Sequence, residues 1–204
     1  MNEAVYTPRP PGSLGISAGF SGWHPMGNVH AIINGIPHTG ANSTTLSRAA
    51  SNRLRQRLSR ASGVTIAANT PLLYRLIRHN PTAARKYRTL YIGSSKDGNV
   101  ARRLVTHVYG LPAGSTALYR WLNQRLPSRS DPDWQRRMGQ KLQRIYLHLG
   151  FATDQPRART DYQRDLNYNE LFLIEKMLQR RYRPLVWDPN DRAFDEALFD
   201  DGFF

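Results

Sequence analysis

Five side chains between residues 74 and 175 have the chemistry needed to cut a phosphodiester bond. They are Tyr74, Tyr91, Arg103, His107 and Glu175. A hydroxyl or an imidazole can move a proton, a guanidinium can stabilise phosphate oxygens, and a carboxylate can hold a divalent cation. Hydrolysis needs all three, because water must lose a proton while negative charge builds on the phosphate and the leaving oxygen. The residue types and their order therefore predict a metal-dependent phosphodiesterase.

The two tyrosines are expected on neighbouring strands. Residues 70–77 and 88–93 are short apolar runs separated by a polar loop of about ten residues, which is typical of two paired strands. The second run ends at Gly93. Tyrosine is common in strands for packing alone, so the two tyrosines suggest chemistry only in combination with the arginine, the histidine and the glutamate.

Arg103 and His107 are expected on the helix that follows. Asp97 and Gly98 predict a turn, and Asn99 can cap a helix beginning at the next residue. The spacing of four residues between Arg103 and His107 places them one above the other on one side of that helix. Arg102 is adjacent, but Arg103 has the helical register that matches His107.

Glu175 is the candidate cation ligand because of its place on a later helix. A third strand is predicted over residues 143–152, and a helix capped by Asn167 or Asn169 is predicted to end at Pro184. Leucines four residues before and three residues after Glu175 make an apolar stripe around it. A carboxylate there is costly unless a cation pairs with it. Glu170 lies nearer the expected helix start, where the helix dipole explains an acid without a function.

These elements predict an α+β fold, with a mainly antiparallel three-stranded sheet flanked by helices. Residues 70–190 would form the main domain, with a helical insertion at 110–141. Residues 1–69 would form an N-terminal extension, comprising a Gly- and Pro-rich arm whose residues 29–33 resemble a strand and an arginine-rich helix at 43–61. Residues 191–204 would form an acidic tail.

The sequence resembles the GIY-YIG nuclease family. Leu72-Leu73-Tyr74 keeps the tyrosine of the first signature but lacks its glycine, and Tyr91-Ile92-Gly93 matches the second signature. Arg103 and His107 stand for the Arg-x-x-x-His element. Glu175 is followed after three residues by a leucine, then by a basic run and Pro184, as in the excision-repair nuclease subunit. The resemblance covers roughly residues 70–190 and is interrupted by the insertion.

The resemblance implies the roles of the five residues. Tyr74 would be the general base, Arg103 would stabilise phosphate oxygens, and Tyr91 and His107 would position water or relay a proton. Glu175 would hold Mg²⁺ or Mn²⁺. The sequence departs from the family pattern at two places. Trp187 stands where an asparagine often follows the proline, with Asn190 three residues later. Ser94 stands where a lysine often follows the second tyrosine, so Lys96 could serve only if this loop is longer.

The charge of the chain indicates a polyanionic partner. The formal net charge is +14, from four lysines and 25 arginines against 15 acids, and arginine binds phosphate through two parallel hydrogen bonds. Coding bias toward arginine is the alternative explanation. Double-stranded DNA is the expected partner, although charge does not exclude RNA. The expected contacts outside the five-residue site are Lys96, Arg102, Arg53, Arg57, Arg120 and Arg136.

Three functions remain open. The chain could be a restriction-type DNA endonuclease, which would be dimeric if it cuts both strands. It could instead be an antibacterial DNase toxin that is inhibited by an acidic immunity protein. It could also be a non-catalytic nucleic-acid-binding protein on a degenerate nuclease scaffold, because the first glycine is lost and the asparagine is displaced. The chain has no membrane-length apolar run and no secretory signal, so a cytoplasmic site of action is expected, after delivery into another cell if it is a toxin. The lack of cysteine excludes disulfides and cysteine metal sites but leaves the compartment open.

Overall fold

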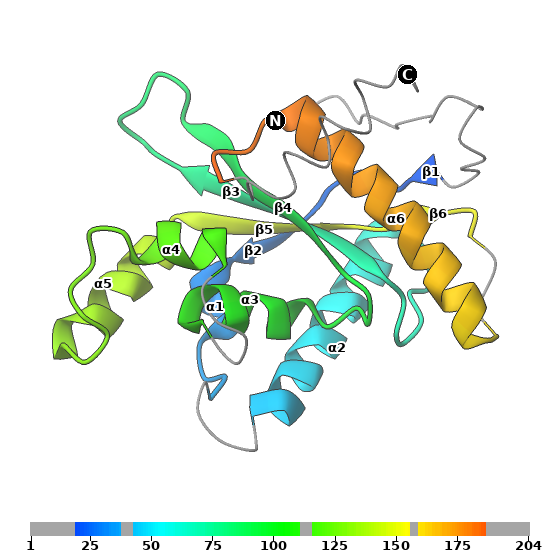
Figure 1. The fold of residues 1–204 in the computed structure, drawn as a ribbon, viewed down its shortest axis with the longest axis horizontal. Helices are drawn as coiled ribbons and strands as arrows, with labels where there is room; N and C mark the ends of the chain where they lie inside the picture. Colours follow the sequence, from blue (N-terminus) through cyan, green and yellow to red (C-terminus); the bar gives the residue numbers. More distant parts are fainter. Residues whose placement is uncertain (1–18, 38–42, 111–115, 156–158, 187–204) are drawn as a thin grey trace.

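The computed structural model describes residues 19–37, 43–110, 116–155 and 159–186. In these ranges the chain forms six helices and two antiparallel sheets, so the α+β prediction is confirmed (Figure 1). The predicted acidic tail at 191–204, Trp187 and Asn190 lie outside the described residues. No helix in the described ranges combines the length and the apolar composition needed to span a bilayer.

The central sheet has four strands, not the three that were predicted. Its order is β2 (His24–Asn28), β5 (Ile145–Gly150), β3 (Leu72–His79) and β4 (Tyr87–Ser95), and each neighbouring pair is antiparallel. The fourth strand comes from the arm. Its residues, His-Pro-Met-Gly-Asn, carry no alternating apolar pattern, and a register shift interrupts its pairing with β5. The strand is therefore specified by the open edge of β5 more than by its own sequence.

The segment predicted as a strand at residues 29–33 is a helix, α1 (Val29–Ile33). The side chain of Asn28 accepts a hydrogen bond from the Ala31 N–H and so caps it. A run of apolar residues this short does not distinguish strand from helix, and the cap decided the outcome. A second, two-stranded sheet pairs β1 (Gly19–Phe20) with β6 (Ala152–Thr153).

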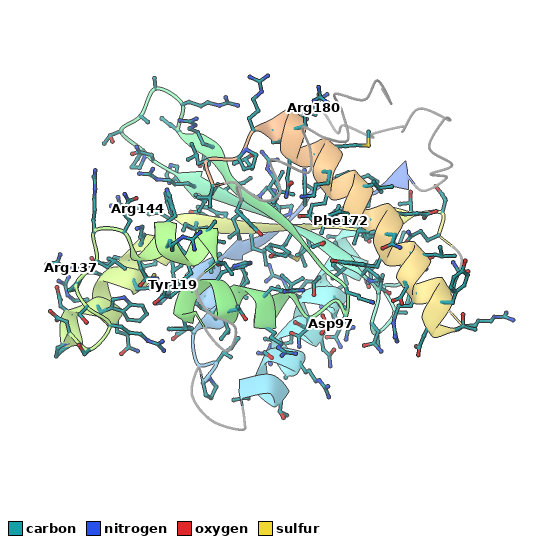
Figure 2. The ribbon with its side chains drawn as sticks, viewed as in Figure 1. Asp97, Tyr119, Arg137, Arg144, Phe172 and Arg180 are labelled. Carbon is teal, nitrogen blue, oxygen red and sulfur yellow. The ribbon has the colours of Figure 1, made fainter. Side chains whose placement is uncertain are left out.

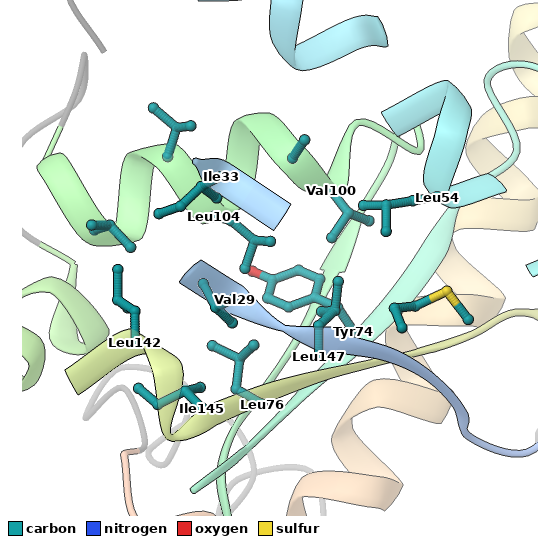
Figure 3. Packing of buried hydrophobic residues seen from close by; sticks show 14 of the residues in the cluster. Val29, Ile33, Leu54, Tyr74, Leu76, Val100, Leu104, Leu142, Ile145 and Leu147 are labelled. Atoms are coloured by element: carbon teal, nitrogen blue, oxygen red, sulfur yellow. The ribbon is translucent and has the colours of Figure 1, made fainter. Parts of the chain in front are cut away.

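Helices cover both faces of the central sheet (Figure 1). On one face α1, α2 (Ser43–Ser62) and α3 (Val100–Tyr109) pack on the larger core. The ring of Tyr74 lies in that core among aliphatic side chains such as Leu104 and Leu147 (Figure 3). On the other face α6 (Asp161–Tyr182) packs on a smaller core through Leu171, Ile174 and Leu178. Residues on alternate positions of β3 therefore belong to different cores.

The insertion forms two helices, α4 (Ala117–Asn123) and α5 (Pro132–Gln143), in agreement with the helical insertion that was predicted. Both lie at the end of the molecule away from α6 (Figure 1). Trp134 is buried there, and its indole N–H donates to Asn123. The ammonium of Lys141 donates to the carbonyl oxygens of Trp121 and Leu122 at the C-terminal end of α4. Trp134 therefore serves packing, and Trp121 packs, partly buried, against the larger core.

The last helix begins earlier than predicted. Its N-cap is Thr160, whose side chain accepts from the Gln163 N–H, and not Asn167 or Asn169. Asn167 is buried inside the helix and accepts a hydrogen bond from Gln163. The first two turns of α6 carry few apolar residues, so periodicity did not reveal them. Glu170 consequently lies mid-helix, where it accepts a hydrogen bond from Gln155 and gains nothing from the helix start.

Candidate active site

Three aromatic side chains form the centre of the candidate site on the α3 face of the sheet. The Tyr74 hydroxyl and the His107 Nε2 atom are 2.7 Å apart and share a hydrogen bond. The Tyr91 ring centroid lies 5.9 Å from that of Tyr74 and 5.2 Å from that of His107. Three residues that the sequence predicted to act together are therefore in mutual contact.

Gly93 makes this packing possible. It lies directly opposite Tyr74 in the β3–β4 ladder, two residues after Tyr91 and on the same face. A Cβ atom at this position would lie 2.6 Å from the Tyr74 hydroxyl oxygen and 2.7 Å from a ring carbon of Tyr91. Real Cβ atoms do not come so close to their neighbours, so the two rings can lie over β4 only because this residue has no side chain.

The His107 ring is fixed from its other side by the insertion. Its Nδ1 atom lies 3.0 Å from the hydroxyl oxygen of Thr116, which also accepts the Tyr119 N–H as the N-cap of α4. Thr116 was not singled out from the sequence, where its residue type, which is common at helix N-caps, was the only signal. The insertion therefore holds the imidazole in place. Whether the Thr116 hydroxyl donates to Nδ1 or accepts from it determines which ring nitrogen of His107 carries the proton.

Burial controls the protonation of both groups. It raises the pKa of Tyr74 well above its usual value of 10, the nearby Tyr91 and Glu175 raise this pKa further, and Arg103 lowers it. Burial also lowers the pKa of His107 to about 4, and Arg103 lowers it too. At neutral pH the pair is therefore a protonated phenol beside a neutral imidazole, and transfer of the proton from Tyr74 to His107 is uphill.

His107 should make the protein acid-sensitive. Its pKa is about 4 when folded and about 6.5 when unfolded, so its contribution to stability is complete above pH 6.5 and is lost as pH falls toward 4. Between pH 7 and pH 5 we expect a loss of about 2 kcal/mol from this group. Urea denaturation at both pH values measures it in the parent and in His107→Gln. An equal pH dependence in the two proteins would contradict the assignment.

Glu175 reaches the same centre from α6. Its side chain is 6% exposed, and it is close enough to Tyr74 to raise the pKa of that hydroxyl. Its Oε1 atom accepts a hydrogen bond of 2.9 Å from Gln179, which also donates to the Ile92 carbonyl of β4 at 3.0 Å. Gln179 was missed in the sequence, where the only signal was its position one turn after Glu175.

Arg103 lies between the buried aromatic centre and a groove on the surface. It is exposed on α3, yet its charge lowers the pKa of both Tyr74 and His107. It lines a groove of about 590 Å³ that we call the basic groove. The groove has four cationic side chains and several neutral polar ones: Lys96, Arg102, Arg103, Arg164, Asn69 and Thr106. Lys96 and Arg102 were predicted from the sequence as contacts to nucleic acid. Arg164 was missed because the helix that carries it was predicted to begin only at Asn167 or Asn169.

An ion pair lies at the rim of the basic groove. The Lys96 ammonium pairs with the Asp165 carboxylate at 2.5 Å and lies 5.8 Å from the centre of the Tyr168 ring. Both partners are about half exposed, so water screens the pair and it holds the side chains only weakly. Asp97, at the start of the turn before α3, also lines this groove and is labelled in Figure 2.

The other predicted nucleic-acid contacts lie elsewhere. Arg53 and Arg57 are exposed on α2, and Arg120 is exposed on α4. Arg136 is exposed on α5, where it pairs with Asp133 at 2.7 Å. None of these four arginines lines the basic groove. A role in binding DNA stays a prediction for each of them.

The residues around Glu175 can be tested for their fit to a metal. In the described ranges no three His, Cys, Asp or Glu side chains cluster closely enough to hold an ion among themselves. A single carboxylate suits a hard cation such as Mg²⁺, which keeps several water ligands. It does not suit a structural zinc site, which takes four nitrogen or sulfur ligands. The donor set therefore fits the expected Mg²⁺ or Mn²⁺.

Comparisons with models of protein families, with curated proteins and with solved structures each returned no match for this chain.

Proposed function

We propose that the chain is a metal-dependent DNA endonuclease of the GIY-YIG type. The observation that carries the proposal is the convergence of Tyr74, Tyr91, His107, Arg103 and Glu175 on one place, although they come from two strands and two helices. An exposed arginine and a buried carboxylate that both act electrostatically on one tyrosine are what phosphodiester hydrolysis would require.

The order of elements supports the family assignment. The strands that carry the two tyrosines are adjacent, and the third predicted strand, β5, pairs with the other side of β3. The helix with Arg103 and His107 directly follows β4, and the helix with Glu175 follows β5. The four-stranded sheet therefore contains the expected three strands in consecutive places, with β2 added at one edge.

Each of these side chains would have a separate role in the reaction. Arg103, at the mouth of the site, would bind the non-bridging oxygens of the scissile phosphate. Tyr74 would accept a proton from the attacking water as it passes its own hydroxyl proton to the His107 Nε2 atom, which lies 2.7 Å away. Glu175 would hold Mg²⁺, which when bound would stabilise the charge on the phosphate and the leaving oxygen.

One observation favours the non-catalytic alternative. Tyr74 is only 2% exposed and its pKa is raised, so its hydroxyl is a weak base in this conformation. Catalysis requires Arg103 and the cation to overcome the effect of burial. Labelled duplex DNA decides between the two functions: cleavage with Mg²⁺ or Mn²⁺ that stops in EDTA supports the nuclease. Tight salt-sensitive binding without cleavage under either metal would establish the alternative.

The basic groove should contact the DNA backbone. Arg102→Gln and Arg164→Gln are each expected to weaken binding and to reduce the slope of log affinity against log salt by about 0.9, because each removes one phosphate contact. Binding is measured in EDTA, so that the DNA stays intact. Arg137→Gln is the matched control, since Arg137 is exposed at the α5 end of the molecule (Figure 2). An unchanged slope in both groove variants would mean that the DNA lies elsewhere.

A further inference from the structure

Gln179 connects the candidate metal ligand to the edge of the sheet. It is 2% exposed, and its single amide nitrogen donates to Glu175 Oε1 at 2.9 Å and to the Ile92 carbonyl at 3.0 Å. Both hydrogens of that nitrogen are therefore used. Since β4 also carries Tyr91 and Gly93, this amide ties the carboxylate on α6 to the strand that shapes the aromatic centre.

The orientation of that amide is fixed by its surroundings. The ammonium of Lys176, which is 1% exposed, lies 3.5 Å from the Gln179 carbonyl oxygen and 4.9 Å from the centre of the Phe172 ring. If the amide turned over, its oxygen would face the two oxygens of Glu175 and Ile92, and its nitrogen would face the ammonium. Both exchanges replace attraction by repulsion, so Gln179 is held with its N–H groups toward Glu175.

We infer that Gln179 is a positioning residue that holds the Glu175 carboxylate in place for its divalent cation. The inference rests on the proposed function, because it assumes that Glu175 is the ligand. A buried carboxylate without this donor would lose a charge-assisted hydrogen bond and could turn away from the site. Groups that orient metal ligands in this way typically contribute 10- to 100-fold to metal affinity.

Binding of Mn²⁺ alone, without DNA, tests the inference. The electron paramagnetic resonance signal of free Mn²⁺ gives the affinity of the parent, Glu175→Gln, Gln179→Met and Gln179→Asn. We expect Gln179→Met to bind about 10- to 100-fold more weakly, because the shape is kept and the donor is lost. We expect Gln179→Asn to bind more weakly as well, because its shorter side chain moves the amide donor away from Glu175. A residue with only a structural role would lower stability but leave the Mn²⁺ affinity of the folded protein unchanged.

Gln163→Met is the matched control, since Gln163 is on the same helix and donates to Asn167, not to Glu175. It should bind Mn²⁺ like the parent. If Gln179→Met does not fold, Gln179→Asn decides alone: weaker binding supports the inference, and unchanged or tighter binding overturns it. Equal affinity of the parent and Gln179→Met overturns the inference only. Equal affinity of the parent and Glu175→Gln, or no binding by the parent, overturns the proposed metal site and the inference with it.

Discussion

Replacing Gly93 with alanine is expected to disable the site while the rest of the fold stays. The added methyl group would lie 2.6 Å from the Tyr74 oxygen and 2.7 Å from the Tyr91 ring, so both rings must move. A displacement of about 1 Å at a catalytic group can lower the rate by about 100-fold. Overpacking of this kind also costs about 1–3 kcal/mol of unfolding free energy. Cleavage rates and urea denaturation measure the two effects.

Gly139→Ala is the control for this prediction. Gly139 lies within α5, where an added Cβ would meet only the end of the His30 side chain, at 3.3 Å. Alanine is favoured over glycine in a helix by up to about 1 kcal/mol, so this variant should be neutral or slightly more stable. If Gly93→Ala cleaves DNA at the parent's rate, Tyr74 and Tyr91 do not act from the positions described.

Glu175→Gln should lower the Mg²⁺-dependent cleavage rate by at least about a thousandfold, which corresponds to about 4 kcal/mol of lost transition-state stabilisation. The amide keeps the size of the side chain and can still accept from Gln179, so the fold should be retained. DNA affinity measured in EDTA should be unchanged or slightly higher, because one negative charge is removed from a protein that binds a polyanion.

Glu170→Gln is the matched control for that prediction. Glu170 is on the same helix, but its carboxylate accepts a hydrogen bond from Gln155 and not from Gln179. We expect it to cleave within about threefold of the parent rate, since most partly exposed polar changes have small effects. A large loss of activity in both variants would indicate a general effect on α6, and the assignment of Glu175 as the ligand would then fail.

The sequence predicted the parts of this fold that have a strong local pattern. The strands around Tyr74 and Tyr91, the helix capped by Asn99 and the two helices of the insertion all carry apolar periodicity with a clear start or end. The β2 strand has no such pattern, because it is defined by pairing with β5. The first turns of α6 are polar, so Thr160 was overlooked as the cap.

The five chemical residues could be predicted, but the groups that hold them could not. Tyrosine, arginine, histidine and glutamate have side chains whose chemistry is visible in the sequence alone. Thr116 and Gln179 are ordinary polar residues, and their roles arise only from contacts with His107 and Glu175 across the fold. The basic groove likewise joins residues from α3 and α6 that lie far apart in the chain.

The most direct test of the central claim is incubation of the parent protein with supercoiled plasmid, with Mg²⁺ and with EDTA, beside Glu175→Gln. We predict that the parent converts the plasmid to nicked or linear DNA only when the metal is present, and that the variant leaves it supercoiled. Plasmid that stays supercoiled under Mg²⁺ and Mn²⁺ with the parent, or equal cutting by parent and variant, would contradict the account.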